Sequence, residues 1–228
     1  MNAAIDKTDN QLKNDVLAEL SYDPSLKIAD IGVLVKEGAV TRTGYITSFG
    51  EKWDALRAAK RVSGVAAIAE DLEVQLPGSV HHTDGDIAAA AADQLAWSTG
   101  IPKGAVNILV RDGWLTLDGD VEGWHLKNSA EKYVRYLAGV KGVTNLITVS
   151  PQIPPGAIEV EITEAFKRSA VLDASRINVE TSGSKVILRG KVRNYVDQEE
   201  AERVAWAAPG VTAVENHLTP AWPWGFDD

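Results

Sequence analysis

The sequence predicts an α+β protein built from three tandem units, each with the element order α-β-β-α-β. One pattern of glycines and apolar residues recurs three times along the 228 residues, as repeat architectures require. Within each copy, the apolar spacing alternates between that of helices and that of strands. The chain has no cysteine, which excludes disulfide frameworks and thiolate metal sites. Apolar side chains therefore have to supply the cores.

The repeat is clearest around the second strand of each unit. Residues 38–46 read GAVTRTGYI, and the same register recurs 75 residues later at 113–121 and 71 residues after that at 184–192. Twenty residues beyond the strand-ending glycine, each copy has a Gly-Val pair. Matches at so many fixed offsets indicate three copies of one folding unit.

The elements of one unit follow from the spacing of its apolar residues. Leu12, Val16 and Leu20 lie at helical spacing, which predicts a first helix. Val106, Ile108 and Val110 are β-branched residues at every second position, which predicts a half-buried strand. A short turn joins it to a second alternating strand, so we expect an antiparallel hairpin.

Two sets of glycines divide the remaining part of each unit. The first set ends the second strand and predicts a bulge or a close backbone approach; it comprises Gly44, Gly119 and Gly190. The second set predicts the end of the second helix; it comprises Gly64, Gly139 and Gly210. A final strand follows the helical crossover and is compatible with a parallel pairing. We therefore expect a three-stranded mixed sheet with two helices packed on one face.

Linker-like segments separate the copies. Proline, glycine and polar residues gather between the first and second copies, and prolines between the second and third. The predicted order is a divergent domain 1 at 8–76, a linker at 77–85, domain 2 at 86–150, a Pro-rich linker at 151–156, domain 3 at 157–220 and an aromatic tail at 221–228.

The repeat resembles the BON domain of bacterial osmotic-stress proteins. Copy two carries the pattern as GWLTLDGDV at 113–121 and GVKGVTNLI at 139–147, and copy three has GVTAVENHL at 210–218. Copy one departs from it, with Arg42 and Glu70 at positions where the other copies have leucine and asparagine. The resemblance implies a non-enzymatic module associated with osmotic or envelope stress, with phospholipid or membrane interaction and, in one branch, with potassium binding.

Charge and hydropathy restrict the partners. The formal net charge of −9 gives no general attraction to a nucleic acid backbone, and it disfavours non-specific adhesion to an anionic membrane. No basic and apolar leader is visible at the start, and no apolar run is long enough for a transmembrane segment. We expect a cytoplasmic protein; the oligomeric state is left open.

The search for catalytic and metal-binding residues indicates no enzyme. No nucleophile elbow, P-loop or dinucleotide-binding glycine motif is present. His81, His82 and Asp84 lie in the predicted linker and Asp86 directly after it, at a spacing that matches no metal signature. We predict no catalytic residue and no metal site.

Aromatic residues are the candidate binding residues. Phe49, Trp124 and Tyr195 each follow the strand-ending glycine by five residues; this position predicts either a repeated packing residue or the rim of a binding site. Trp114 alternates with buried leucines, so we expect it in a contact between domains or on a binding surface. The tail residues Trp222, Trp224 and Phe226 predict either a docked strap or a free aromatic anchor.

These observations predict a stress-associated binding module that recognises a hydrophobic, phospholipid or protein partner through its aromatic residues. The alternative is a potassium sensor whose tandem domains compact when the ion binds. Backbone carbonyls at the glycine turns would coordinate that ion, and no other cofactor is expected.

Overall fold

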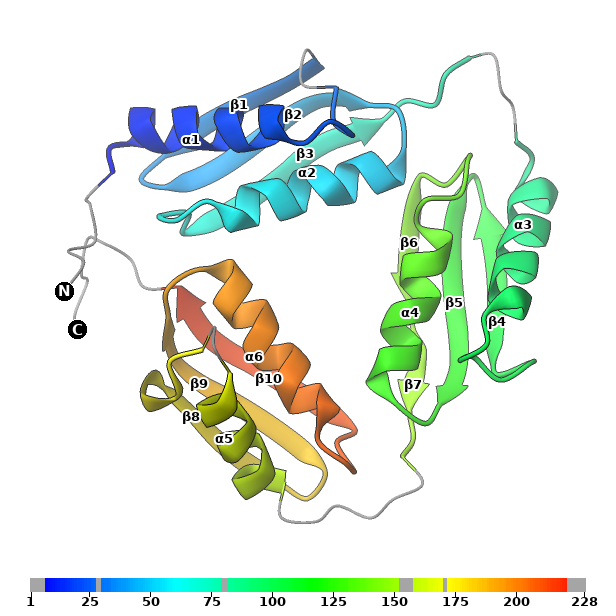
Figure 1. Ribbon diagram of the computed structural model, residues 1–228. Helices are drawn as coiled ribbons and strands as arrows, with labels where there is room; N and C mark the ends of the chain where they lie inside the picture. The colour runs from blue at the N-terminus through cyan, green and yellow to red at the C-terminus, as the bar shows by residue number, and fades with distance from the viewer. Residues whose placement is uncertain (1–6, 28–29, 79–81, 152–157, 170–171, 221–228) are drawn as a thin grey trace.

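The computed structural model describes residues 7–27, 30–78, 82–151, 158–169 and 172–220. It contains three α-β-β-α-β domains, coloured blue to cyan, green, and yellow to red along the chain (Figure 1).

Each domain contributes two helices and the strands of one sheet. Domain 1 consists of α1 (Asp9–Tyr22), β1 (Ile31–Lys36), β2 (Ala39–Ile46), α2 (Phe49–Arg61) and β3 (Ala67–Val74). Domain 2 consists of α3 (Asp84–Trp97), β4 (Val106–Arg111), β5 (Trp114–Val121), α4 (Trp124–Val134), β6 (Gly142–Asn145) and β7 (Thr148–Val149). Domain 3 consists of α5 (Ile158–Arg168), the short helix η2 (Ala174–Arg176), β8 (Ile177–Ser182), β9 (Lys185–Val192), α6 (Tyr195–Ala207) and β10 (Ala213–Pro220).

The second strand is the centre of every sheet. In domain 1, β2 pairs antiparallel with β1 and parallel with β3, and domain 3 repeats this arrangement with β9 between β8 and β10. In domain 2 the third strand is divided into β6 and β7, both parallel to β5. These mixed sheets confirm the predicted fold class.

The first helix of domain 2 begins earlier than we expected. Thr83 accepts a hydrogen bond from the Asp86 backbone N–H, and the Asp86 carboxylate accepts one from that of Thr83, which forms a capping box. The carboxylate of Asp84 also accepts from the backbone N–H groups of Asp112 and Gly113. Part of the segment interpreted as a linker is therefore the start of α3.

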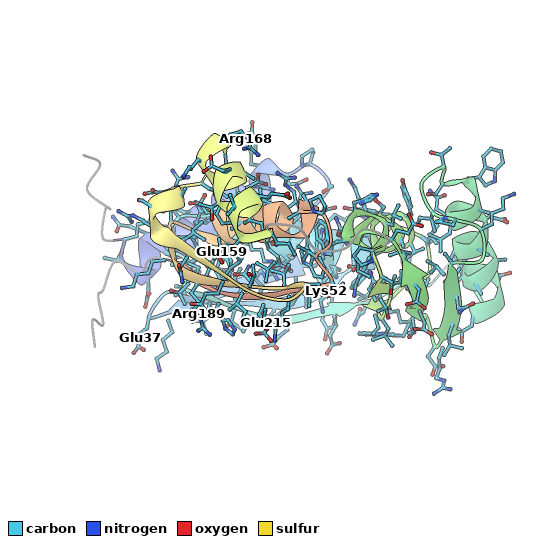
Figure 2. All side chains as sticks on the ribbon, turned by 90° about the horizontal axis from the view of Figure 1, so that it is seen from below. Glu37, Lys52, Glu159, Arg168, Arg189 and Glu215 are labelled. Carbon is cyan, nitrogen blue, oxygen red and sulfur yellow. The ribbon has the colours of Figure 1, made fainter. Side chains whose placement is uncertain are left out.

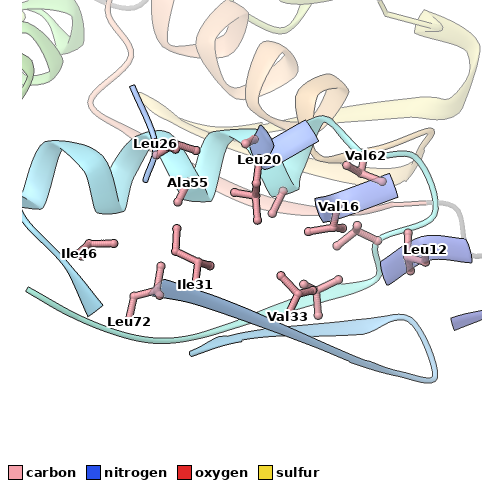
Figure 3. Close-up of a cluster of buried hydrophobic side chains, with 14 residues drawn as sticks. Leu12, Val16, Leu20, Leu26, Ile31, Val33, Ile46, Ala55, Val62 and Leu72 are labelled. Carbon is pink, nitrogen blue, oxygen red and sulfur yellow. The ribbon is translucent and has the colours of Figure 1, made fainter. Parts of the chain in front are cut away.

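Each core lies between the sheet and its two helices. In domain 1, Leu12, Val16 and Leu20 of α1 face Ile31 and Val33 of β1 (Figure 3). The other face of the sheet is polar in domain 3, where Arg189 and Glu215 lie on the opposite side from α5 (Figure 2). Each domain therefore has one apolar layer, as the alternating strand pattern requires.

The strand-ending glycines occupy a close backbone approach. Gly44, Gly119 and Gly190 have φ of +121°, +139° and +134°, a region that side chains with a Cβ avoid. A Cβ at Gly119 would overlap the carbonyl oxygen of Ala105, which precedes β4, and the other two copies have the same geometry. Glycine is therefore required where the hairpin closes.

Domain 1 buries a charge where the other domains bury leucine. Arg42 is fully buried, and its Nη2 lies 3.6 Å from Oε2 of Glu70. Within the described part of the chain, the guanidinium nitrogens have no hydrogen-bond partner. Burial lowers the pKa of Arg42, and Glu70 opposes that shift. Such a cation costs free energy that one imperfect ion pair only partly offsets.

The other two domains use an amide at the position of Glu70. Asn145 donates to the Lys127 carbonyl at 2.9 Å and accepts from the Ile147 N–H at 3.3 Å, which links the edge strand to α4. Asn216 makes the same two contacts in domain 3. Arginine and glutamate therefore replace leucine and asparagine together.

Replacing the buried pair in domain 1 by the residues of its sister domains should stabilise the protein. For the double variant Arg42→Leu/Glu70→Asn, we expect the free energy of unfolding to rise by about 1–3 kcal/mol, because a buried charge is exchanged for an apolar side chain. Urea denaturation followed by circular dichroism measures this change. Glu70→Asn alone should lower stability, since it leaves the guanidinium without its counter-charge. A double variant less stable than the wild type would contradict the interpretation.

Candidate functional site

The repeated aromatic residues join one domain to the next. Phe49, Trp124 and Tyr195 begin α2, α4 and α6. Phe49 packs against the core of domain 2, and Tyr195 packs against the core of domain 1. Trp124 stacks on Trp206 of domain 3, with the ring centroids 6.0 Å apart and the planes 11° from parallel. The structure places the three side chains in three separate joints and does not assemble them into one binding rim.

On the other side of each joint lies a second repeated position, near the end of the second helix of the neighbouring domain. This position is occupied by Lys60, Arg135 and Trp206. The guanidinium carbon of Arg135 lies 3.8 Å from the centre of the Trp53 ring, a cation–π contact. Lys60 pairs with Glu199 across the joint between domains 3 and 1.

Polar contacts complete two of the joints. The Tyr136 hydroxyl donates to the Asp54 carboxylate at 2.9 Å, and its ring lies against Gly50, where a Cβ would collide with it. Burial and the hydrogen bond to Asp54 raise the pKa of Tyr136. The Tyr195 hydroxyl donates to the carbonyl of Ala66 at 2.6 Å.

These contacts close the three domains into a ring. The second helices α2, α4 and α6 face the middle of the molecule in Figure 1. The start of α2 meets the end of α4, the start of α4 meets the end of α6, and the start of α6 meets the end of α2. Opposite ends of helix dipoles are thus adjacent at every joint, which is favourable.

Trp114 lies on the outward face of the domain 2 sheet. Its ring covers Gly142, where a Cβ would overlap it, and its indole N–H donates to Oγ1 of Thr144 at 2.8 Å. The side chain remains 51% exposed. Trp114 is therefore held by its own domain, with about half of its surface free to contact a partner.

The sequence analysis missed the most exposed large apolar side chains. Trp97 and Tyr22 are 86% and 84% exposed and end the first helices of domains 2 and 1. They occupy one repeat position, 75 residues apart, which in domain 3 is Arg168. This position lies outside the buried face of its helix, so the exposure of the aromatic side chain could have been predicted from the helical spacing of the sequence.

Two hollows in the surface have apolar walls. One of about 330 Å³ adjoins the end of α3, with Ala96, Ile101 and Pro102 among its lining residues. The other, of about 780 Å³, lies between α5 and α6 in domain 3, and its walls include Ala165 and Ala207. The equivalent positions in domain 1 are Glu19 and Arg61, whose ion pair at 2.6 Å bridges α1 and α2. Two alanines therefore leave the domain 3 hollow open.

The remaining candidates are these. Trp222, Trp224 and Phe226 lie outside the described residues, as does His81. In the part of the chain that the structure describes, no group of three or more His, Asp or Glu side chains is placed to hold a metal ion. Potassium coordination by backbone carbonyls stays a prediction. Over the same residues, no helix is long and apolar enough to cross a membrane.

Comparison with known families agrees with the repeat. The sequence model of the BON domain matches residues 8–75, 83–151 and 156–220. The chain belongs to the BON domain family. Three BON domains therefore account for most of its length, and the resemblance found in the sequence is confirmed.

A curated relative is similar in sequence to part of the chain. The osmotically-inducible protein Y of Escherichia coli (strain K12) is 29% identical over 141 residues, which cover 60% of this chain and 70% of that protein. Among solved structures, the type III secretion protein CdsD of Chlamydia trachomatis matches 91% of this BON protein and 92% of its own chain at 13% identity and a TM-score of 0.26. Its C-terminal domain matches at a TM-score of 0.25. No inference rests on scores this low.

The stacked tryptophans provide a test of the ring. Trp206 packs against the cores of both domain 2 and domain 3, so Trp206→Ala should lower the free energy of unfolding by about 2–4 kcal/mol through lost burial and ring stacking. Guanidinium denaturation measures this loss. Trp97→Ala is the matched control, since the 86% exposed ring should change stability by less than about 0.5 kcal/mol. Equal effects of the two variants would contradict the joint described here.

Proposed function

We propose that this BON-domain protein is a stress-associated, non-enzymatic binding module that recognises a hydrophobic partner surface through exposed aromatic side chains. The observation that carries the proposal is the 86% exposed indole of Trp97, the last residue of α3. The preceding residue, Ala96, lines an apolar hollow at the same helix end. Exposed aromatic rings and apolar depressions are features of interfaces with proteins and with lipid headgroups.

The roles of the other aromatic residues narrow the proposal. Phe49, Trp124 and Tyr195 are occupied in joints between domains, which leaves Trp97, Trp114 and the tail tryptophans as the candidate anchors. Tyr22 repeats the position of Trp97 in domain 1 and adds a second exposed aromatic side chain of the same kind.

The buried polar groups support a non-enzymatic role. The Glu51 carboxylate accepts hydrogen bonds from the backbone N–H groups of Lys27 and Thr47, and the Asp197 carboxylate accepts from Arg193. Arg135 lies over an indole at a joint. These contacts hold helix ends and domains together, which is a structural use of buried charge.

The relative adds the stress association. The Escherichia coli protein is named as osmotically inducible, and we extend that association to this chain. The location of the protein stays a prediction, as does the identity of the partner.

Vesicle flotation and partner capture test the proposal. We expect the full chain to bind phosphatidylcholine vesicles or a specific protein, and Trp97→Ala to weaken that binding about fivefold or more, since a buried aromatic ring contributes at least about 1 kcal/mol. Trp97→Phe should retain most of the affinity. Because the net charge is −9, neutral vesicles should bind at least as well as anionic ones.

Trp114→Ala and Trp222→Ala assign the remaining anchors by the same assay. Phe49→Leu serves as a control at a joint, and its binding should stay close to that of the wild type. If no vesicle and no protein binds the chain, or if binding survives all three tryptophan substitutions unchanged, the proposal is wrong.

A further inference from the structure

The three joints occupy equivalent positions and differ in chemistry. The joint between domains 1 and 2 places an arginine over an indole, and the joint between domains 2 and 3 stacks two indoles. The joint between domains 3 and 1 uses an ion pair, Lys60 with Glu199, next to the partly buried ring of Tyr195. Each joint will therefore respond differently to a change in the solution.

The joint between domains 3 and 1 also differs in its connection. A short segment of chain links domain 1 to domain 2 and another links domain 2 to domain 3. The contacts between domains 3 and 1 join residues 129 and 139 positions apart, Tyr195 with Ala66 and Lys60 with Glu199. Only non-covalent contacts close the ring at this point, so this joint can open while the other two remain formed.

Tyr195 supplies the part of the joint that salt does not affect. Its ring packs against the core of domain 1, and its hydroxyl donates to the Ala66 carbonyl at 2.6 Å. Burial raises the pKa of Tyr195, so the phenol stays neutral and keeps its proton for the hydrogen bond. Ionic screening leaves apolar burial essentially unchanged.

The ion pair supplies the part that salt weakens. Nζ of Lys60 lies 2.5 Å from Oε1 of Glu199, with the side chains 22% and 50% exposed. Ion pairs this accessible are screened as ionic strength rises, and they shift a two-state equilibrium by roughly two- to fivefold. The charged groups at the joint between domains 1 and 2 are arranged differently. Arg135 is only 4% exposed and pairs with Glu131 of its own domain, and the Asp54 carboxylate accepts from the Tyr136 hydroxyl.

We propose that the joint between domains 3 and 1 is a salt-sensitive latch. Rising ionic strength opens it, which uncovers the ring of Tyr195 and the edge of the domain 1 core that this ring covers. The other two joints keep their contacts, so domains 1 and 3 separate by bending at those joints. This inference does not depend on the proposed function, since it requires no partner.

The chain has no cysteine, so two introduced cysteines can carry a donor and an acceptor dye without background labelling. Asn14→Cys on α1 places one dye at an exposed position of domain 1, and Glu159→Cys on α5 places the other at an exposed position of domain 3. Single-molecule energy transfer in the full-length protein then counts open and closed molecules. Between about 0.05 M and about 0.5 M potassium chloride, we expect the ratio of open to closed molecules to rise two- to fivefold. Sucrose at equal osmolality should leave the ratio unchanged.

Charge exchange assigns the response to the ion pair. Lys60→Glu should open the joint at low salt, and Lys60→Glu/Glu199→Lys should restore both closure and the salt response. Lys167→Glu is the matched control, because it reverses a charge of an exposed pair on α5, away from the joint. Tyr195→Ala should open the joint at every salt concentration while the far-ultraviolet circular dichroism stays that of folded domains.

The outcomes separate cleanly. A wild-type salt response that is lost or reversed in Lys60→Glu, where salt screens a repulsion between two carboxylates, and that returns in the exchanged pair supports the latch. A ratio independent of salt, an equal response to sucrose, or a closed Tyr195→Ala variant overturns it. Since no vesicle or partner is present, failure here leaves the proposed binding function untouched, and failure of that function leaves the latch untouched.

Discussion

The architecture depends on burying one aromatic side chain at the start of each second helix. Each domain is a single apolar layer between a sheet and two helices, and domains of this size enclose only about 60% of the surface that their unfolded chains expose. Phe49 and Tyr195 pack against the core of the next domain, and Trp124, which also contacts its own core, stacks on a tryptophan of the next domain. Three such contacts in one rotational sense close a ring, because the rotation from each domain to the next brings domain 3 back into contact with domain 1.

The equivalence of the joints explains why their chemistry differs. If all three joints used the same pair of side chains, the start of any second helix could dock on the end of any other. The order of the domains would then be specified only by the linkers. The three joints instead use an arginine over an indole, a pair of stacked indoles and an ion pair. The start of each second helix therefore matches the helix end that it contacts. Selectivity of this kind comes from mismatched alternatives as much as from the favourable contact.

The fold was predictable because its signals are local and repeated. Helical spacing, strand alternation and glycines at fixed offsets act within one unit, and the three copies support one another. The start of domain 2 was placed at residue 86, after the start of α3, because Asp84 was interpreted as a linker residue, although a threonine three positions before an acidic residue is a capping signal. The exposed position of Trp97 and Tyr22 was also readable, since the two residues share a repeat register.

The sequence by itself determined the element order, the central strand of each sheet, the positions that only glycine fits and the family. The repeated pattern of glycines and apolar residues is enough to predict these features, because each of them depends on neighbouring residues within one unit. Only the tertiary structure decided which aromatic residues are buried in joints and which are exposed, and that two alanines leave a hollow open between α5 and α6. The physical reason is that a side chain's burial against another domain depends on where that domain lies, and no spacing within a repeat encodes that position.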